Sequence, residues 1–176
     1  TGAGEGTRAA FGGDLYRFSG LLILDGETGA EKRRIRLPIY WTSWLTIADL
    51  DGDGSPEFIW NTQGRVYAVG SDGRIRWTYA FVPGGLPGSP DAYSGVANAQ
   101  VYDLDGDGVP EVVTTSLSEL VILDGRTGLP RASHPSAGLH GSFYTAQNVQ
   151  LVDADSDGHV DILATNVSEP TGLAYL

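Results

Sequence analysis

Short apolar runs, separated by Gly, Asp or Asn, recur along the chain and predict β-strands. Two of them are RVYAVG at 65–70 and ELVILDG at 119–125. Runs of about 4–8 residues that are rich in β-branched and aromatic side chains and end at turn residues are typical of strands. Segments such as GSDG at 70–73 and DGRTG at 124–128 have the composition of hairpin turns. No segment predicts a helix, so we expect an all-β fold.

Three acidic segments divide these strands into a repeat. DLDGDGSPE lies at 49–57, DLDGDGVPE at 103–111 and DADSDGHVD at 153–161. Each segment follows one apolar run and precedes another, and their first residues are 54 and 50 residues apart. Units of this length with about four short strands each are typical of β-propeller blades.

The pattern predicts about three and a half blades of four antiparallel strands. Residues 1–13 form a Gly-rich N-terminal segment, and residues 14–176 form a partial β-propeller with breaks between blades near 38–44, 82–97 and 134–147. Two blades are complete, the N-terminal blade lacks its first strand and the C-terminal blade stops short. A closed ring needs at least about four blades. We therefore expect the remaining blades to belong to a larger propeller or to further copies of this chain.

The acidic segments place carboxylates at the first, third, fifth and ninth positions of a tight loop, where they can turn toward one centre. Two unit charges about 4 Å apart repel by about 1 kcal/mol even in water, and a hard divalent cation reverses the sign of this energy. Calcium suits cages of six to eight oxygen ligands. Gly54, Gly108 and Gly158 stand at the sixth position, where a sharp turn needs a residue without Cβ. The alternative to a calcium site is a solvated acidic turn that binds no ion.

The spacing overlaps with the calcium loop of the EF-hand but differs at a decisive position. An EF-hand has a bidentate Glu at position 12 and a helix on each side. Position 12 here is Trp60, Thr114 or Ala164, and the flanking segments predict strands. The EF-hand and its dockerin-type pairs are therefore excluded.

An apolar strand, the pattern DxDGDGxx[D/E] and a second apolar strand together resemble the FG-GAP/VCBS repeats of integrin-α-type calcium-binding propellers. The resemblance covers residues 14–176 and implies one Ca²⁺ per loop, three in all, on the hairpin between the first two strands of a blade. The third loop has Ser156 where the others have glycine, and it ends in Asp161, so its geometry is expected to differ slightly. The ligands that the resemblance implies are the carboxylates of Asp49, Asp51, Asp53, Glu57, Asp103, Asp105, Asp107, Glu111, Asp153, Asp155, Asp157 and Asp161, and the backbone carbonyls of Ser55, Val109 and His159.

Charge and composition narrow the choice of partners and location. The chain has 22 acidic and 11 basic side chains and a formal charge of −11, a surface that repels nucleic acid and anionic membranes. No apolar run reaches the roughly 18 residues of a membrane span, so we expect no membrane insertion. Cysteine is absent, which excludes thiolate chemistry. Extracellular calcium modules bind at about 10⁻⁴–10⁻³ M, which predicts an extracellular or cell-surface location, with the periplasm as an alternative.

The connections between blades are candidates for ligand binding. They are long and rich in Gly, Pro, Ser and aromatic residues, as binding loops often are. Packing between blades is the alternative for these aromatics. No catalytic residue is identified, because no nucleophile or carboxylate is tied by a motif to His134 or His140. The residues that could contact a protein or glycan ligand are Tyr40, Trp41, Trp44, Tyr93, Phe143 and Tyr144.

Three functions remain open. A non-catalytic extracellular binding, adhesion or surface-assembly module is favoured. A fragment of a polysaccharide-active propeller enzyme, similar to pectin-type lyases, is the second; paired acids or a basic residue in a central cleft would favour it, and none is identified. The third follows from LLILDGETG at 21–29 and LVILDGRTG at 120–128, which are similar to a turn of quinoprotein propellers and would imply pyrroloquinoline quinone. It ranks last, because calcium loops in every blade are not typical of that family.

Overall fold

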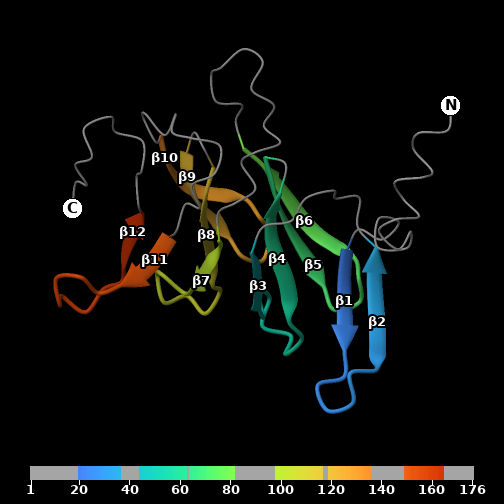
Figure 1. Ribbon diagram of the computed structural model, residues 1–176. Helices are drawn as coiled ribbons and strands as arrows, with labels where there is room; N and C mark the ends of the chain where they lie inside the picture. Colours follow the sequence, from blue (N-terminus) through green and yellow to red (C-terminus); the bar gives the residue numbers. More distant parts are fainter. Residues whose placement is uncertain are drawn as a thin grey trace, which may run out of the picture. The chain divides into compact units, whose positions relative to one another are not determined.

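The computed structural model describes residues 20–36, 44–62, 64–81, 98–116, 119–135 and 149–164. These segments contain twelve β-strands in four antiparallel sheets and no helix (Figure 1). The all-β fold predicted from the sequence is therefore confirmed. The chain divides into two compact units, residues 1–40 and 41–176, which are described separately.

The first unit contains a hairpin of β1 (Gly20–Leu24) and β2 (Glu31–Arg36). Its turn is built around Asp25, whose Oδ1 accepts hydrogen bonds from the Thr28 N–H at 2.8 Å and from the Thr28 hydroxyl at 2.9 Å. The Lys32 ammonium lies 2.7 Å from Asp25 Oδ2. Lys32, followed by the contacts with Thr28, lowers the pKa of Asp25 to about 2. The further strand expected before this hairpin and the Gly-rich segment lie outside the described residues.

The second unit begins with a four-stranded sheet in the order β3-β4-β5-β6. Consecutive strands pair as antiparallel neighbours, as the turn-rich segments between them predict. The observed β5 has the bounds that the sequence predicts. The strands are β3 (Leu45–Ala48), β4 (Glu57–Thr62), β5 (Arg65–Gly70) and β6 (Ile75–Ala80).

The same arrangement recurs in the second sheet, and its first half recurs in a further hairpin. The second sheet has the order β10-β9-β8-β7, and β11 pairs with β12. In all three cases an acidic segment joins the first strand to the second. The number of blades and the closure of a ring stay predictions. The strands are β7 (Gln100–Tyr102), β8 (Glu111–Thr115), β9 (Glu119–Asp124), β10 (Pro130–Pro135), β11 (Val149–Val152) and β12 (Asp161–Ala164).

One strand is longer than the sequence predicts. Strand β10 continues to Pro135, and His134 lies opposite Leu120 of β9. The sequence analysis placed His134 in a connection between blades together with His140. Because β9 offers backbone partners as far as Glu119, the pairing extends through His134, and this residue belongs to an exposed strand.

The two four-stranded sheets share one hydrophobic core. The core is reinforced by polar contacts from one sheet to the other: the Thr46 hydroxyl donates to the Ala99 carbonyl at 2.7 Å, and the Asn61 amide donates to the Thr115 carbonyl at 2.9 Å. Each sheet therefore buries one face against its neighbour, as stacked repeats require. The buried core residues are Leu50, Ile59, Val66, Ala68, Trp77, Phe81, Ala99, Val112, Val121 and Leu123.

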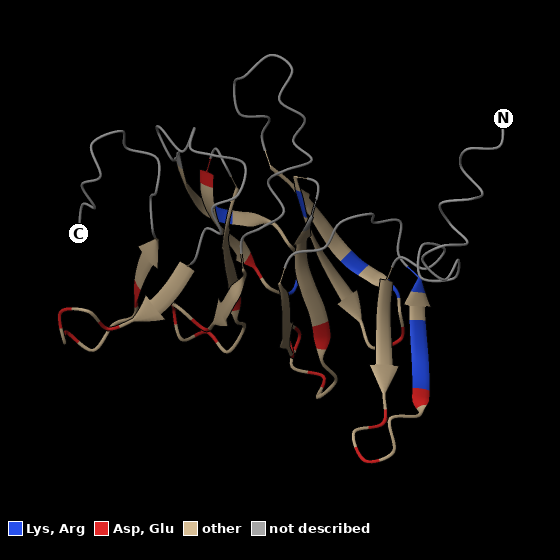
Figure 2. Ribbon diagram, viewed as in Figure 1, with Lys and Arg blue, Asp and Glu red and all other residues tan. Residues whose placement is uncertain are grey.

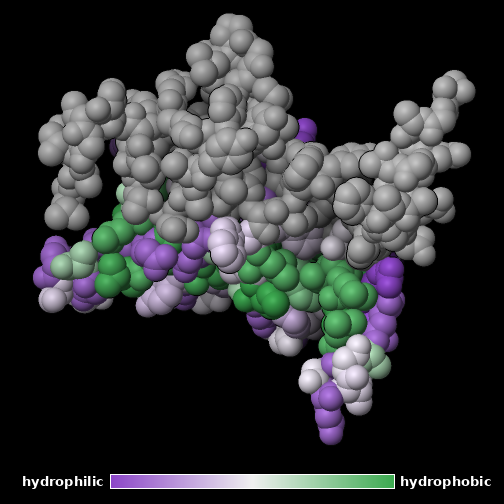
Figure 3. Space-filling view, in the orientation of Figure 1, coloured by the Kyte–Doolittle hydropathy of each residue, from purple (hydrophilic) through white to green (hydrophobic). Residues whose placement is uncertain are grey.

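Apolar side chains also remain exposed on the first strand of the first sheet. Leu45 and Ile47 of β3 are exposed, and Trp44 directly before them is 62 % exposed. Figure 3 shows apolar surface among the described residues. A sheet with apolar residues on both faces suits an array in which each repeat contacts two neighbours. In the part of the chain that the structure describes, no helix is long and apolar enough to cross a membrane.

Candidate metal centres

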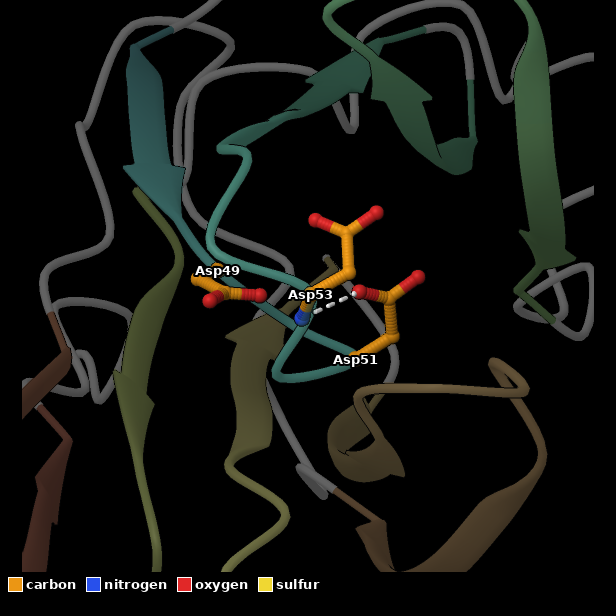
Figure 4. Close-up of side chains that lie close together, drawn as sticks. All are labelled: Asp49, Asp51 and Asp53. Atoms are coloured by element: carbon orange, nitrogen blue, oxygen red, sulfur yellow. Dashed lines mark hydrogen bonds between the residues drawn. The ribbon is translucent and has the colours of Figure 1, made fainter.

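The β3–β4 loop gathers three carboxylates. One oxygen from each of Asp49, Asp51 and Asp53 lies within 4.8 Å of the others. The loop is held in this shape by its own backbone: the Gly52 and Gly54 N–H groups donate to the two oxygens of Asp49 at 2.8 and 2.9 Å. The Asp53 N–H donates to Asp51 at 3.1 Å (Figure 4). The loop therefore orients its carboxylates through hydrogen bonds made within the loop.

The other two acidic loops also gather three carboxylates, but there the ninth position takes the place of the fifth. Figure 2 shows acidic residues at all three loops. Asp103 accepts hydrogen bonds from the Gly106 and Gly108 N–H groups at 2.8 and 2.9 Å, and Asp153 accepts one from Gly158 at 3.0 Å. The carboxylate groups with oxygens within 4.8 Å of one another are Asp103, Asp105 and Glu111 in the second loop, and Asp153, Asp155 and Asp161 in the third.

The ninth position of each loop makes the same contact. The backbone N–H of the second loop residue donates to this carboxylate, over 2.9 Å for Glu57, 2.8 Å for Glu111 and 2.9 Å for Asp161. The shorter Asp161 reaches its donor as well as the two glutamates do. The slight difference in geometry expected for the third loop is therefore not seen in this contact.

The turn at the fourth position is a feature that the sequence analysis missed. Gly52 and Gly106 have φ of 76° and 75°, so both lie in the left-handed region. The signal was the glycine at this position in two of the three loops. Ser156 occupies the third with φ of 65°, a strained conformation for a residue with Cβ that costs about 1–3 kcal/mol.

The contacts observed at the seventh position involve the N–H groups of the three residues and not their predicted ligand carbonyls. The N–H groups of Ser55, Val109 and His159 each donate to the aspartate two residues earlier, at 2.7, 2.8 and 2.8 Å. These bonds fix the backbone at the seventh position. The role of the three carbonyls as ligands stays a prediction.

Glu57 is the buried member of the first loop. Its side chain is about 2 % exposed, and its Oε1 accepts no hydrogen bond among the described residues. The nearest cation is the Arg76 Nε, at 4.0 Å. Burial raises the pKa of Glu57, and the charges of Asp51 and Asp53 raise it further. Glu57 is not among the three grouped carboxylates of its loop, but a cation near its buried oxygen would offset the missing donor. The oxygen-rich residues of this loop therefore fit a bound calcium ion.

The second loop already contains a cation from the protein. Arg131 of β10 donates to Glu111 Oε1, and its other terminal nitrogen lies 2.5 Å from Asp105 Oδ2 and 3.9 Å from Asp107 Oδ2. No local sequence pattern reveals this contact, because Arg131 lies 26 positions from Asp105.

Most of the candidate ligand-binding residues lie outside the described segments. Only Trp44 is described, and its exposed side chain precedes β3. His140 is also outside these segments, so the proposed binding face stays a prediction. The others that lie outside them are Tyr40, Trp41, Tyr93, Phe143 and Tyr144.

Comparison with known families identifies the segment that holds the first two loops. The family described as FG-GAP-like repeat matches residues 49–114. Over these residues the chain is similar to that family. The match confirms the resemblance inferred from the sequence. The third acidic loop lies beyond the matched segment, but it shares two backbone hydrogen bonds with the other loops, one to its ninth residue and one to its first.

Comparisons with individual proteins add one solved structure. No curated protein matches the chain. The chain is similar to the Vibrio cholerae biofilm matrix protein Bap1, with 21 % sequence identity and a TM-score of 0.47. The similarity covers 89 % of this chain and 27 % of that protein, so the chain spans about a quarter of its length.

Proposed function

We propose that this chain is a calcium-stabilised, non-catalytic extracellular module for binding, adhesion or surface assembly. The single observation that carries the calcium part is the buried Glu57 Oε1, which has no hydrogen-bond donor among the described residues and whose carboxyl has its pKa raised by burial and by the charges of Asp51 and Asp53. The presence of three grouped carboxylates in each of the three acidic loops supports one ion per loop. Three Ca²⁺ ions would change the formal charge from −11 to −5.

The chain's own residues prepare each loop for a cation. A carboxylate has about four acceptor sites, and the loop N–H groups use two of them on Asp49 and three on Asp103. One oxygen of Asp49 and one of Asp103 also lie within 4.8 Å of oxygens from two further carboxylates of the same loop. A bound calcium ion would supply the positive charge that offsets their repulsion.

The binding part of the proposal concerns the connections between blades. A protein or a glycan would contact their aromatic side chains, and the rest of the propeller or further copies would cover the exposed apolar strand β3. An extracellular, cell-surface or periplasmic location suits loops of this kind, because they bind calcium at about 10⁻⁴–10⁻³ M.

Calorimetric titration of the metal-free chain tests the calcium part. We expect binding of three Ca²⁺ per chain with dissociation constants of about 10⁻⁴–10⁻³ M. Titration with Mg²⁺ is the matched control, and weaker binding is expected because Mg²⁺ needs stricter octahedral geometry. Absence of binding at 10 mM Ca²⁺, about ten times the upper limit of that range, would refute the calcium part of this function.

Screening on glycan arrays and in protein pull-downs tests the adhesion part. We expect a ligand whose capture is lost in EGTA and in a Tyr93→Ala, Phe143→Ala, Tyr144→Ala variant. Turnover of pectic polymers by the chain would instead support the enzyme hypothesis. Capture that survives the triple substitution would place the ligand elsewhere.

Glu57→Gln is expected to have opposite effects without and with calcium. The folded protein raises the pKa of Glu57, so folding disfavours the charged carboxylate. Removal of this negative charge should therefore stabilise the metal-free protein at pH 7 by about 1 kcal/mol. In calcium the variant should lose the contribution of the first site, about 1.4 kcal/mol at ten times its Kd. Urea unfolding in EGTA and in calcium measures both effects.

Glu111→Gln is the matched control for this pair of experiments. Glu111 occupies the same position in the second loop, but Arg131 donates to its Oε1. Loss of this charge should therefore destabilise the metal-free protein. Destabilisation of the metal-free protein by Glu57→Gln as well would contradict the assignment of Glu57 as an unsatisfied ligand.

A further inference from the structure

Each described pair of third and fourth strands has a β-bulge, and a basic residue occupies all three bulges. Strand register skips Lys32 between β1 and β2, Arg76 between β5 and β6, and Arg131 between β9 and β10. A bulge leaves its extra residue without a partner in the ladder and re-aims its side chain. The repeat therefore places a cation at one defined point of each of these sheets.

The three cations reach different groups. Lys32 pairs with Asp25 of its own turn, and Arg76 pairs with Asp72 at 3.1 Å. Arg131 contacts Asp105 and Glu111, two of the three grouped carboxylates of the second acidic loop. Among the described bulges, only the third carries its cation onto two candidate metal ligands.

One residue in the neighbouring strand explains the difference between Arg76 and Arg131. The ninth-position glutamate pairs with Gly70 in the first sheet and with Asp124 in the second. The guanidinium of Arg76 lies over Gly70, where a Cβ would be 2.4 Å from its Nη2. Asp124 has a side chain at this place, so Arg131 cannot lie back over β9 in the same way and extends to the acidic loop.

We propose that Arg131 sets the calcium affinity of the second loop: its guanidinium holds Asp105 and Glu111 in the metal-free protein and leaves them when Ca²⁺ binds. This inference rests on the proposed calcium function. An ion pair of a guanidinium with two carboxylates is among the stronger polar contacts in proteins, and it must be broken before both carboxylates can coordinate a metal. The second loop should therefore bind calcium more weakly than the first loop.

The contrast with the first loop follows from the same contacts. Glu57 Oε1 has no hydrogen-bond donor among the described residues, whereas Glu111 Oε1 accepts one from Arg131. At Glu57 calcium would meet only the Arg76 Nε 4.0 Å away, whereas at Glu111 it replaces a guanidinium that donates a hydrogen bond. The first loop should bind calcium at least about tenfold more tightly than the second.

The test isolates the second loop by calorimetry of the full chain. Asp51→Asn and Asp155→Asn weaken the first and third sites, and both asparagines keep an acceptor for the loop N–H groups. In this background Arg131→Gln is expected to raise calcium affinity by about tenfold, and Arg131→Lys by less. Arg65→Gln is the matched control, because its loss changes the net charge equally. Arg65 begins β5 of the first sheet, at the opposite end of that strand from Gly70, which pairs with Glu57.

The melting temperature of the metal-free protein is the second measurement. In EGTA, Arg131→Gln should melt at a lower temperature than the parent chain, because three carboxylates lose their cation, and saturating calcium should abolish the difference. Unchanged calcium affinity in Arg131→Gln, with binding by the parent chain intact, overturns this inference and leaves the calcium function standing. No calcium binding by any variant, parent chain included, overturns both.

Discussion

Calcium at ten times the Kd of each site is expected to raise the melting temperature of the chain by about 8–16 °C over its value in EGTA. At ten times its Kd, each ion stabilises the folded state by about 1.4 kcal/mol, or about 4 kcal/mol for three independent sites. For a chain of this size, 1 kcal/mol corresponds to about 2–4 °C. Differential scanning calorimetry of one sample divided between calcium and EGTA measures the shift.

Two controls separate specific binding from screening. Sodium chloride at equal ionic strength should give only a small shift, because it screens the loop carboxylates without coordinating them. A variant with Asp53→Asn, Asp107→Asn and Asp157→Asn should melt no lower than the parent chain in EGTA, since each loop loses one negative charge and each asparagine keeps an acceptor for the single N–H that the aspartate accepts. That variant should respond little to calcium. Equal melting temperatures of the parent chain in calcium and EGTA would exclude a structural role for the ion.

The structural features that the sequence predicts are those formed by residues close together in the chain. Alternation of apolar runs and turn residues located the strands of both complete sheets, and the regular spacing of acidic residues located the loops. Each of these features depends on residues close together in the chain, such as the Asp49 carboxylate and the N–H of Gly54 five residues later. Patterns of this range are visible in a single sequence.

The features that the sequence did not predict depend on strand pairing. Arg131 reaches Asp105 because a bulge shifts the register of β10 against β9, and no local pattern gives that register. Burial is a second case: all five residues of β8 are buried, although its sequence, EVVTT, contains two threonines and a glutamate. Neighbouring strands and a second sheet cover this strand, and such coverage follows from tertiary packing.

Trp77→Ala is expected to reduce the free energy of unfolding by about 3–5 kcal/mol, the usual cost of removing a large buried aromatic side chain. Trp77 is 8 % exposed and belongs to the core between the two four-stranded sheets. Its indole N–H donates to the Gly125 carbonyl of the second sheet at 2.7 Å. The substitution would remove the ring and leave that carbonyl without its donor.

The glycine beneath the ring provides an independent test of the same contact. Gly128 has φ of 69°, and a Cβ added to it would lie 2.5 Å from Trp77 Cδ2. Gly128→Ala should therefore destabilise the protein both through backbone strain and by displacing the indole. The position requires glycine because the DGRTG turn of the second sheet packs directly on Trp77 of the first.

Trp44→Ala is the matched control, because Trp44 is 62 % exposed and its loss should cost less than about 1 kcal/mol. Urea unfolding measured in the same buffer compares the three variants. If Trp77→Ala cost no more than Trp44→Ala, the two sheets would not depend on this contact.

Trp77 bonds to the turn that follows β9, while Arg131 extends from β10 directly after that turn, so a loosened contact should also weaken the ion pair with Glu111. Trp77→Ala in the background that isolates the second loop is therefore expected to shift calcium affinity in the same direction as Arg131→Gln.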